Sequence, residues 1–140
     1  MDSLNLKLCD IQGRLFELFY DTKYDIEMLV TTFMNSEIAK NLDSKFNKMQ
    51  WVGEEYLLEE VLEIADMKIC KGNIVITKDI LYWMGYIYRF WNLYTGEESY
   101  KIYKQAPFQT LMTNYLLFHT MDASMAIDDL KEIYNQKKRK

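Results

Sequence analysis

The segment between Thr77 and Gly96 constrains the fold of this chain most strongly. Its apolar residues recur every three or four positions and cover nearly every side of a helix. A helix that is apolar almost all round is buried among other elements. Thr77 is a favourable N-terminal cap, Gly96 is placed to end the helix, and Gly85 in the middle indicates close approach of a neighbouring helix. We therefore predict a central buried helix near residues 78–95.

The flanking segments predict further helices around this one. They carry apolar stripes of helical spacing, capping residues such as Asp25, Ser36 and Asp122, and only one proline in 140 residues. Residues 69–76 differ, because two short β-branched runs flank Lys71-Gly72-Asn73, as in a small β-hairpin or an extended connector. The predicted fold is all-α, a compact domain of about six to seven helices over residues 1–136, followed by a basic tail at 137–140.

Charge excludes several classes of partner. The net charge is −4, and the four residues of the tail contribute +4, so the rest of the chain is strongly acidic. Nucleic acid phosphates and anionic membrane surfaces repel such a body. The longest apolar run, Ile80 to Tyr94, is too short to cross a bilayer. With no signal-peptide pattern in the first residues, we expect a cytoplasmic protein that binds neither nucleic acid nor membrane.

One predicted helix, over residues 54–67, has a polar side that carries only acidic residues. Such a side is either a solvated helix face or a docking patch for a basic protein partner. The high content of tyrosine and tryptophan suits a protein interface as well as a core. The candidate partner-binding residues are Glu54, Glu55, Glu59, Glu60, Glu63 and Asp66.

Arg89 lies inside the helix that is expected to be buried. A buried guanidinium needs a carboxylate or several carbonyl groups around it. One expectation is therefore an internal ion pair, with Glu97 or with one of Glu54 and Glu55.

The other expectation for Arg89 is a functional one. Tyr82 and Tyr86 lie near it in the sequence and could line a pocket in which the guanidinium holds an anion or a carboxylate. His119 continues an apolar stripe and is expected to be a packed, hydrogen-bonded structural residue, but it is also the one histidine that could act as a base. The candidate ligand-pocket residues are Arg89, Tyr82, Tyr86 and His119.

No motif for catalysis or for a cofactor is present. A single histidine and two widely spaced cysteines, Cys9 and Cys70, do not make a zinc site of the Cys/His kind. The glycine-rich loops that cradle phosphates do not occur. The sequence therefore predicts no metal, no cofactor and no catalytic residues, and two reduced thiols.

Several strings carry a resemblance to a known group of proteins. They are YWMGYIYRFW (Tyr82–Trp91), TGEES (Thr95–Ser99), FHTMD (Phe118–Asp122) and MAIDDL (Met125–Leu130). From Met49 onward the chain resembles small, uncharacterised bacterial proteins that are encoded beside toxin genes and regarded as antitoxins of toxin–antitoxin pairs. The resemblance implies a protein that acts by direct contact with a protein partner, a toxin, and it implies no catalytic residue.

Two functions follow as hypotheses. The first is a non-enzymatic protein-binding module, antitoxin-like or inhibitor-like. The second is a small helical enzyme or ligand-binding protein that uses Arg89 and nearby tyrosines to hold an anionic small molecule. An ion-paired Arg89 in a filled core, beside an exposed acidic or aromatic patch, favours the first. An Arg89 that faces an open polar cavity favours the second.

Overall fold

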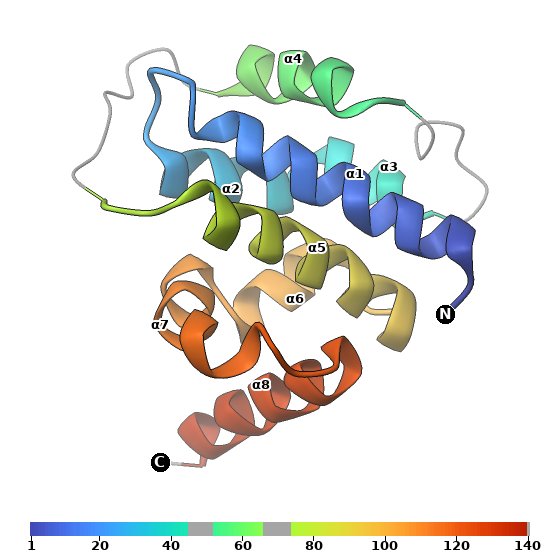
Figure 1. The fold of residues 1–140 in the computed structure, drawn as a ribbon, viewed down its shortest axis with the longest axis vertical. Coiled ribbons are helices and arrows are strands. Elements are labelled where there is room, and N and C mark those ends of the chain that lie inside the picture. Colours follow the sequence, from blue (N-terminus) through green and yellow to red (C-terminus); the bar gives the residue numbers. More distant parts are fainter. Residues whose placement is uncertain (45–51, 66–73, 140) are drawn as a thin grey trace.

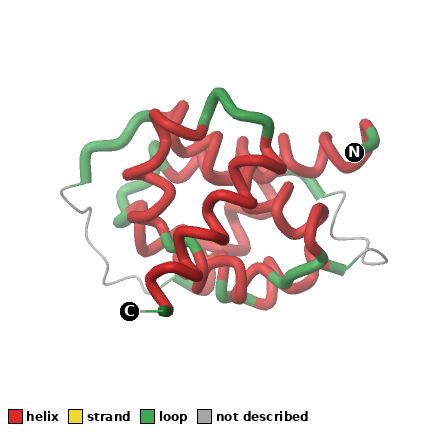
Figure 2. The backbone as a smooth tube through the Cα atoms, turned by 90° about the horizontal axis from the view of Figure 1, so that it is seen from below, coloured by secondary structure: helices red, strands yellow, loops and turns green. Residues whose placement is uncertain are grey.

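The structure, a computed structural model, describes residues 1–44, 52–65 and 74–139, which form eight helices and no strand (Figures 1 and 2). The all-α prediction is confirmed, with eight helices where about six to seven were expected, and two of them, α3 and α6, are only seven residues long. The helices are α1 (Ser3–Phe19), α2 (Ile26–Met34), α3 (Glu37–Asp43), α4 (Glu54–Ile64), α5 (Lys78–Thr95), α6 (Ser99–Gln105), α7 (Phe108–Phe118) and α8 (Ala123–Lys138).

The helix α5 is central, as predicted. It packs most extensively against α1 and also contacts α6, α7 and α8, and Figure 1 shows it between α1 and the α7–α8 pair. Thr77 caps it by accepting a hydrogen bond from the Ile80 amide at 3.3 Å, and Gly96 ends it with a left-handed φ of 80°. Only part of its surface is covered, however. Trp91 is fully buried, whereas Tyr82, Trp83, Tyr86 and Phe90 are half-buried and Tyr94 is exposed.

Two glycines allow α1 and α5 to cross with their backbones in contact. A Cβ atom on Gly85 would lie 2.8 Å from the carbonyl carbon of Gln12 and 2.9 Å from the Cα of Gly13. A Cβ atom on Gly13 would lie 2.8 Å from the ring of Tyr82. Gln12 also donates a hydrogen bond to the Gly85 carbonyl at 3.0 Å. The close approach predicted at Gly85 is confirmed, and α1 is the neighbour.

The other capping residues also behave as predicted. The side chains of Asp25, Ser36 and Asp122 accept hydrogen bonds from amides in the first turns of α2, α3 and α8. The predicted hairpin lies mostly outside the described residues, and residues 74–76, which are described, form no strand. The helix α8 runs through Lys138, so the predicted basic tail begins as helix. No helix in the described part of the chain has the length and apolar character needed to cross a membrane.

Candidate functional site

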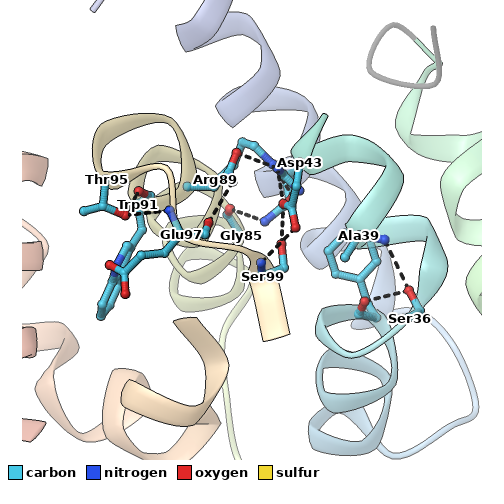
Figure 3. Close-up of polar contacts among 12 residues, drawn as sticks. Ser36, Ala39, Asp43, Gly85, Arg89, Trp91, Thr95, Glu97 and Ser99 are labelled. Carbon is cyan, nitrogen blue, oxygen red and sulfur yellow. Dashed lines mark hydrogen bonds and ion pairs between the residues drawn. The ribbon is translucent and has the colours of Figure 1, made fainter. Parts of the chain in front are cut away.

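Arg89 is enclosed in the core, where it lines a cavity of about 10 Å³ that is too small for a ligand. Its side chain is 3% exposed. The Nη1 atom donates to Asp43 Oδ1 at 2.8 Å (Figure 3). It also donates to Asn92 Oδ1 at 3.0 Å, and Nε donates to Gln12 Oε1 at 2.9 Å. Burial lowers the pKa of Arg89 from its ordinary value, and the charge and hydrogen bond of Asp43 oppose that shift. The guanidinium is thus held in the interior through Nε and Nη1, while Nη2 is buried without a partner among the described residues.

Asp43 makes this ion pair a junction of several helices. Its carboxylate also accepts hydrogen bonds from Ser99, from the amide at 2.8 Å and from the hydroxyl at 2.7 Å (Figure 3). Since Asp43 ends α3 and Ser99 begins α6, the pair ties both short helices to α5. The predicted internal ion pair is confirmed, but its partner is not Glu97 or an acidic residue of α4.

Glu97 has a separate structural role. Its carboxylate accepts hydrogen bonds from Lys131 Nζ at 2.5 Å, Gln105 Nε2 at 2.6 Å and Trp91 Nε1 at 3.0 Å. Burial by itself raises the pKa of Glu97, but the bonds from Lys131, Trp91 and Gln105 outweigh it and lower the pKa to about 2. Glu97 therefore joins the end of α5 to α6 and α8 as a carboxylate.

An open groove of about 720 Å³ lies between α1, α5 and the end of α7, and we call it the aromatic groove. Three of the four candidate ligand-pocket residues, Tyr82, Tyr86 and His119, line it, and Arg89 does not. The structure thus separates the predicted cation from the predicted aromatic residues. The lining residues are Asp10, Arg14, Glu17, Asp79, Tyr82, Trp83, Tyr86, Tyr115 and His119.

One wall of the aromatic groove is a paired polar cluster. The hydroxyl of Tyr82 donates to Asp10 Oδ1 at 2.5 Å, and Arg14 Nε donates to Asp10 Oδ2 at 2.8 Å. Burial opposes ionisation of Asp10, but the bonds from Tyr82 and Arg14 outweigh it and lower its pKa. Burial and the bond to Asp10 raise the pKa of Tyr82. Asp10 is therefore a carboxylate that Arg14 neutralises.

The opposite wall is aromatic. Trp83 meets the ring of Tyr115 edge-on at a centroid distance of 5.6 Å, and His119 stacks on Tyr115 at 4.2 Å. His119 Nδ1 is 2.7 Å from the Tyr115 carbonyl oxygen. His119 is hydrogen-bonded, as expected, but it is exposed at the end of α7 instead of packed in the core, because the helix ends at Phe118.

Serine, threonine and cysteine nucleophiles lie outside the aromatic groove in the described part of the chain. Cys9, the one free thiol in the described part of the chain, is fully buried, and burial raises its pKa to about 12 against the opposing charge of Arg89. A thiol of that pKa stays protonated and unreactive near neutral pH.

A second hollow, of about 190 Å³, adjoins the aromatic groove, and we call it the acidic shelf. It shares Arg14 and Glu17 with the groove and extends to the first turn of α4 and the start of α5. Together the two hollows are lined by two basic residues, Arg14 and Lys78, and by six acidic ones, namely Asp10, Glu17, Asp21, Glu54, Glu55 and Asp79.

Four of these six carboxylates have no ion pair within the described residues. Arg14 pairs with Asp10, and Lys78 pairs with Asp21 at 3.2 Å. The remaining four are Glu17, Glu54, Glu55 and Asp79. Within the described chain, the region between α1, α4 and α5 therefore presents four carboxylates without an ion pair beside aromatic rings. Three of these carboxylates lie in the first turns of α4 and α5, where the helix N-terminus favours negative charge.

The structure divides the acidic face predicted on residues 54–67. Glu54 and Glu55 line the acidic shelf. Glu59 and Glu63 are exposed and Glu60 is half-buried, and these three residues line neither hollow. Asp66 lies outside the described residues.

Sequence reasoning missed the acidic residues that α1 contributes. Asp10, Arg14, Glu17 and Asp21 recur at steps of three and four residues, which marks one charged face of a helix. Asp79 likewise precedes Tyr82, Trp83 and Tyr86 at helical spacing. Each pattern predicts one face of a helix, but only the fold shows that the charged face of α1 meets the aromatic face of α5.

Comparison of the chain with protein-family models, with curated proteins and with solved structures gave no match. The resemblance to antitoxin proteins therefore stays a prediction, and function is inferred from the geometry of the two hollows.

Proposed function

We propose that this chain is a non-enzymatic protein-binding module that holds a basic segment of a protein partner in the aromatic groove and on the acidic shelf. The observation that carries the proposal is the set of four carboxylates without ion pairs, Glu17, Glu54, Glu55 and Asp79, around two connected hollows. Lysine and arginine side chains of a partner would supply the missing counter-charges.

Charge and shape together favour a partner over solvent. Like charges that lie close together repel one another, so a basic partner that neutralises them gains free energy and is also steered to the site as it approaches. The aromatic rings beside the carboxylates add the apolar and stacking contacts that anchor protein interfaces. An acidic surface of this kind suits an antitoxin-like inhibitor, which would cover a basic, nucleic-acid-facing surface of a toxin or of another target in the cytoplasm.

The position of Arg89 weighs against the alternative, a small enzyme or ligand-binding protein that holds an anion. Arg89 already has Asp43, Asn92 and Gln12 as partners inside the core. The open groove near the tyrosines is lined by three acidic residues and one arginine, so it repels an anion.

Affinity capture tests the proposal. The tagged chain serves as bait in an extract of the source organism, and mass spectrometry identifies bound proteins. We expect one stoichiometric partner with a basic surface, which is lost as the salt concentration rises because exposed ion pairs are screened. Repeated capture without any protein partner would contradict the proposal.

A pair of charge reversals on one helix locates the interface. Glu54→Lys with Glu55→Lys reverses two carboxylates on the acidic shelf, and we expect it to weaken the partner at least about tenfold, which corresponds to about 1.4 kcal/mol. Glu59→Lys with Glu63→Lys makes the same change in charge on the same helix outside both hollows, and it should have a smaller effect. Circular dichroism checks that both variants are folded. Equal losses of affinity for the partner in the two variants would show that the acidic shelf is not part of the interface.

A further inference from the structure

We infer that the aromatic groove is a recognition site for one arginine side chain, whose guanidinium lies against the rings of α5 and α7 and pairs with Glu17 or Asp79. The inference rests on the proposed function, because the arginine belongs to the basic segment of the protein partner. It adds the chemical group that the groove accepts and the residues that accept it.

The aromatic rings of the groove lie close to one another. Tyr82 and Tyr86 follow one another along α5 with centroids 6.0 Å apart, and Trp83 contacts Tyr115 of α7 at 5.6 Å. All four side chains are half-buried, so each is held by neighbours and keeps part of its surface exposed, although His119 already covers one face of Tyr115. Faces of tyrosine and tryptophan attract a cation placed over them, and arginine is the side chain most often found there.

Among the described residues, one of the three carboxylates that line the groove has an ion pair and two do not. Asp10 is occupied, since Tyr82 and Arg14 both donate to it. Glu17, on α1, and Asp79, in the first turn of α5, have no ion pair within the described part of the chain. Glu17 on α1 and Asp79 on α5 can therefore accept hydrogen bonds from a ligand in the groove.

The groove suits a guanidinium group better than it suits other ligands. A guanidinium is planar, so it can stack on a ring and donate forked hydrogen bonds to a carboxylate at the same time. An ammonium group is strongly hydrated and lacks a plane to stack. An anion would meet an excess of negative charge, and an apolar ligand would bury two carboxylates without partners, which is unfavourable.

The volume fits a side chain that arrives as part of a larger partner. About 720 Å³ lies within the range of small-molecule sites, and it is more than one extended side chain fills. The remaining space accommodates neighbouring residues of the partner and bridging water. The acidic shelf shares Arg14 and Glu17 with the groove, so it can receive a second cationic side chain of the same segment.

The test uses the full chain and capped amino acids, with nuclear magnetic resonance as the readout. The probe is N-acetyl-arginine-N-methylamide, and the signal is the indole NH of Trp83, assigned with the variant Trp83→Phe. We expect saturable binding with a dissociation constant of about 1 mM, which is reasonable for a ligand of this size. The neutral citrulline analogue should bind at least about tenfold more weakly, and the capped lysine should bind more weakly than the capped arginine.

Matched variants assign the carboxylates. Glu17→Gln with Asp79→Asn preserves the shape of the groove, and it should weaken the capped arginine at least about fivefold. Glu59→Gln with Glu63→Gln removes the same charge from a surface outside the groove and should leave the affinity within about twofold. Equal binding of arginine and citrulline, or unchanged binding in the first variant, would overturn the inference.

Two further outcomes separate this inference from the function it rests on. If the unmodified chain captures a protein partner but does not bind the capped arginine, the arginine site is overturned and the protein-binding function stands. N-propylguanidine carries the same single positive charge as the capped arginine but has no peptide groups. If it bound more tightly than the capped arginine, the groove would be assigned to a small metabolite, and the peptide source would be wrong.

Discussion

Replacing Asp43 by alanine is expected to destabilise the protein far more than the loss of a surface carboxylate does. The side chains of Asp43 and Arg89 are 8% and 3% exposed, and they are 2.8 Å apart. Without Asp43, Arg89 keeps only the neutral oxygens of Gln12 and Asn92. Breaking a buried pair from one side leaves an uncompensated charge and costs about 3–5 kcal/mol.

That magnitude is a large part of the stability of a domain of this size, which is about 5–15 kcal/mol. We therefore expect the midpoint of thermal unfolding to fall by about 10 °C or more in Asp43→Ala. Urea denaturation followed by far-UV circular dichroism near neutral pH measures the change in the free energy of unfolding. The matched control is Asp21→Ala, which removes a half-exposed ion pair with Lys78 and should cost about 1 kcal/mol or less.

A double variant tests the cause. Arg89→Met removes the guanidinium and replaces it with an apolar side chain of similar length. If the loss in Asp43→Ala comes from a buried unpaired charge, Asp43→Ala with Arg89→Met will be less destabilised than the sum of the two single changes. Additive losses, or a loss in Asp43→Ala no larger than in Asp21→Ala, would refute the assignment of this pair as the junction of α3, α5 and α6.

Two other predictions concern the helix crossing and the pH dependence of stability. Gly85→Ala should lower the free energy of unfolding by about 2 kcal/mol or more, because its Cβ atom would meet the backbone of α1. The control Gly53→Ala, with open space around it, should lower the free energy of unfolding by about 1 kcal/mol at most. Equal thermal stability of the two variants would contradict the close crossing. Glu97 has a pKa of about 2 in the folded chain, below its ordinary value, so it contributes stability above about pH 5 that is lost as pH falls toward 2. The deficit of Glu97→Gln in urea denaturation should therefore shrink over that range, and a deficit independent of pH would speak against this role.

The local features of the fold were predictable because they depend on residues close together in the sequence. The bounds of α5, the caps at Asp25, Ser36 and Asp122, and the left-handed turn at Gly96 all follow from side chains within one or two helical turns. The burial of Arg89 with a carboxylate was also predictable, since a guanidinium inside an apolar helix needs one.

The pairing of distant segments was not predictable in the same way. Asp43 lies 46 residues from Arg89, and no periodicity in either segment indicates that α3 ends beside α5. The aromatic groove likewise depends on α1 and α7 lying on either side of α5. An apolar pattern predicts that a helix is buried but not which of its sides stays open. The helix near 78–95 was expected to be buried on nearly every side, whereas Trp83 lines the groove.

The contact of Gly13 with Tyr82 and of Gly85 with Gln12 has a consequence for how a partner is received. The two helices carry Glu17 and Asp79, and their crossing leaves no room for one helix to slide past the other. The part of the groove formed by α1 and α5 is thus preorganised, and these two helices lose little conformational entropy on binding. Most of the ordering falls on the incoming segment, so association should proceed in one kinetic step, without a slower rearrangement of this chain after encounter.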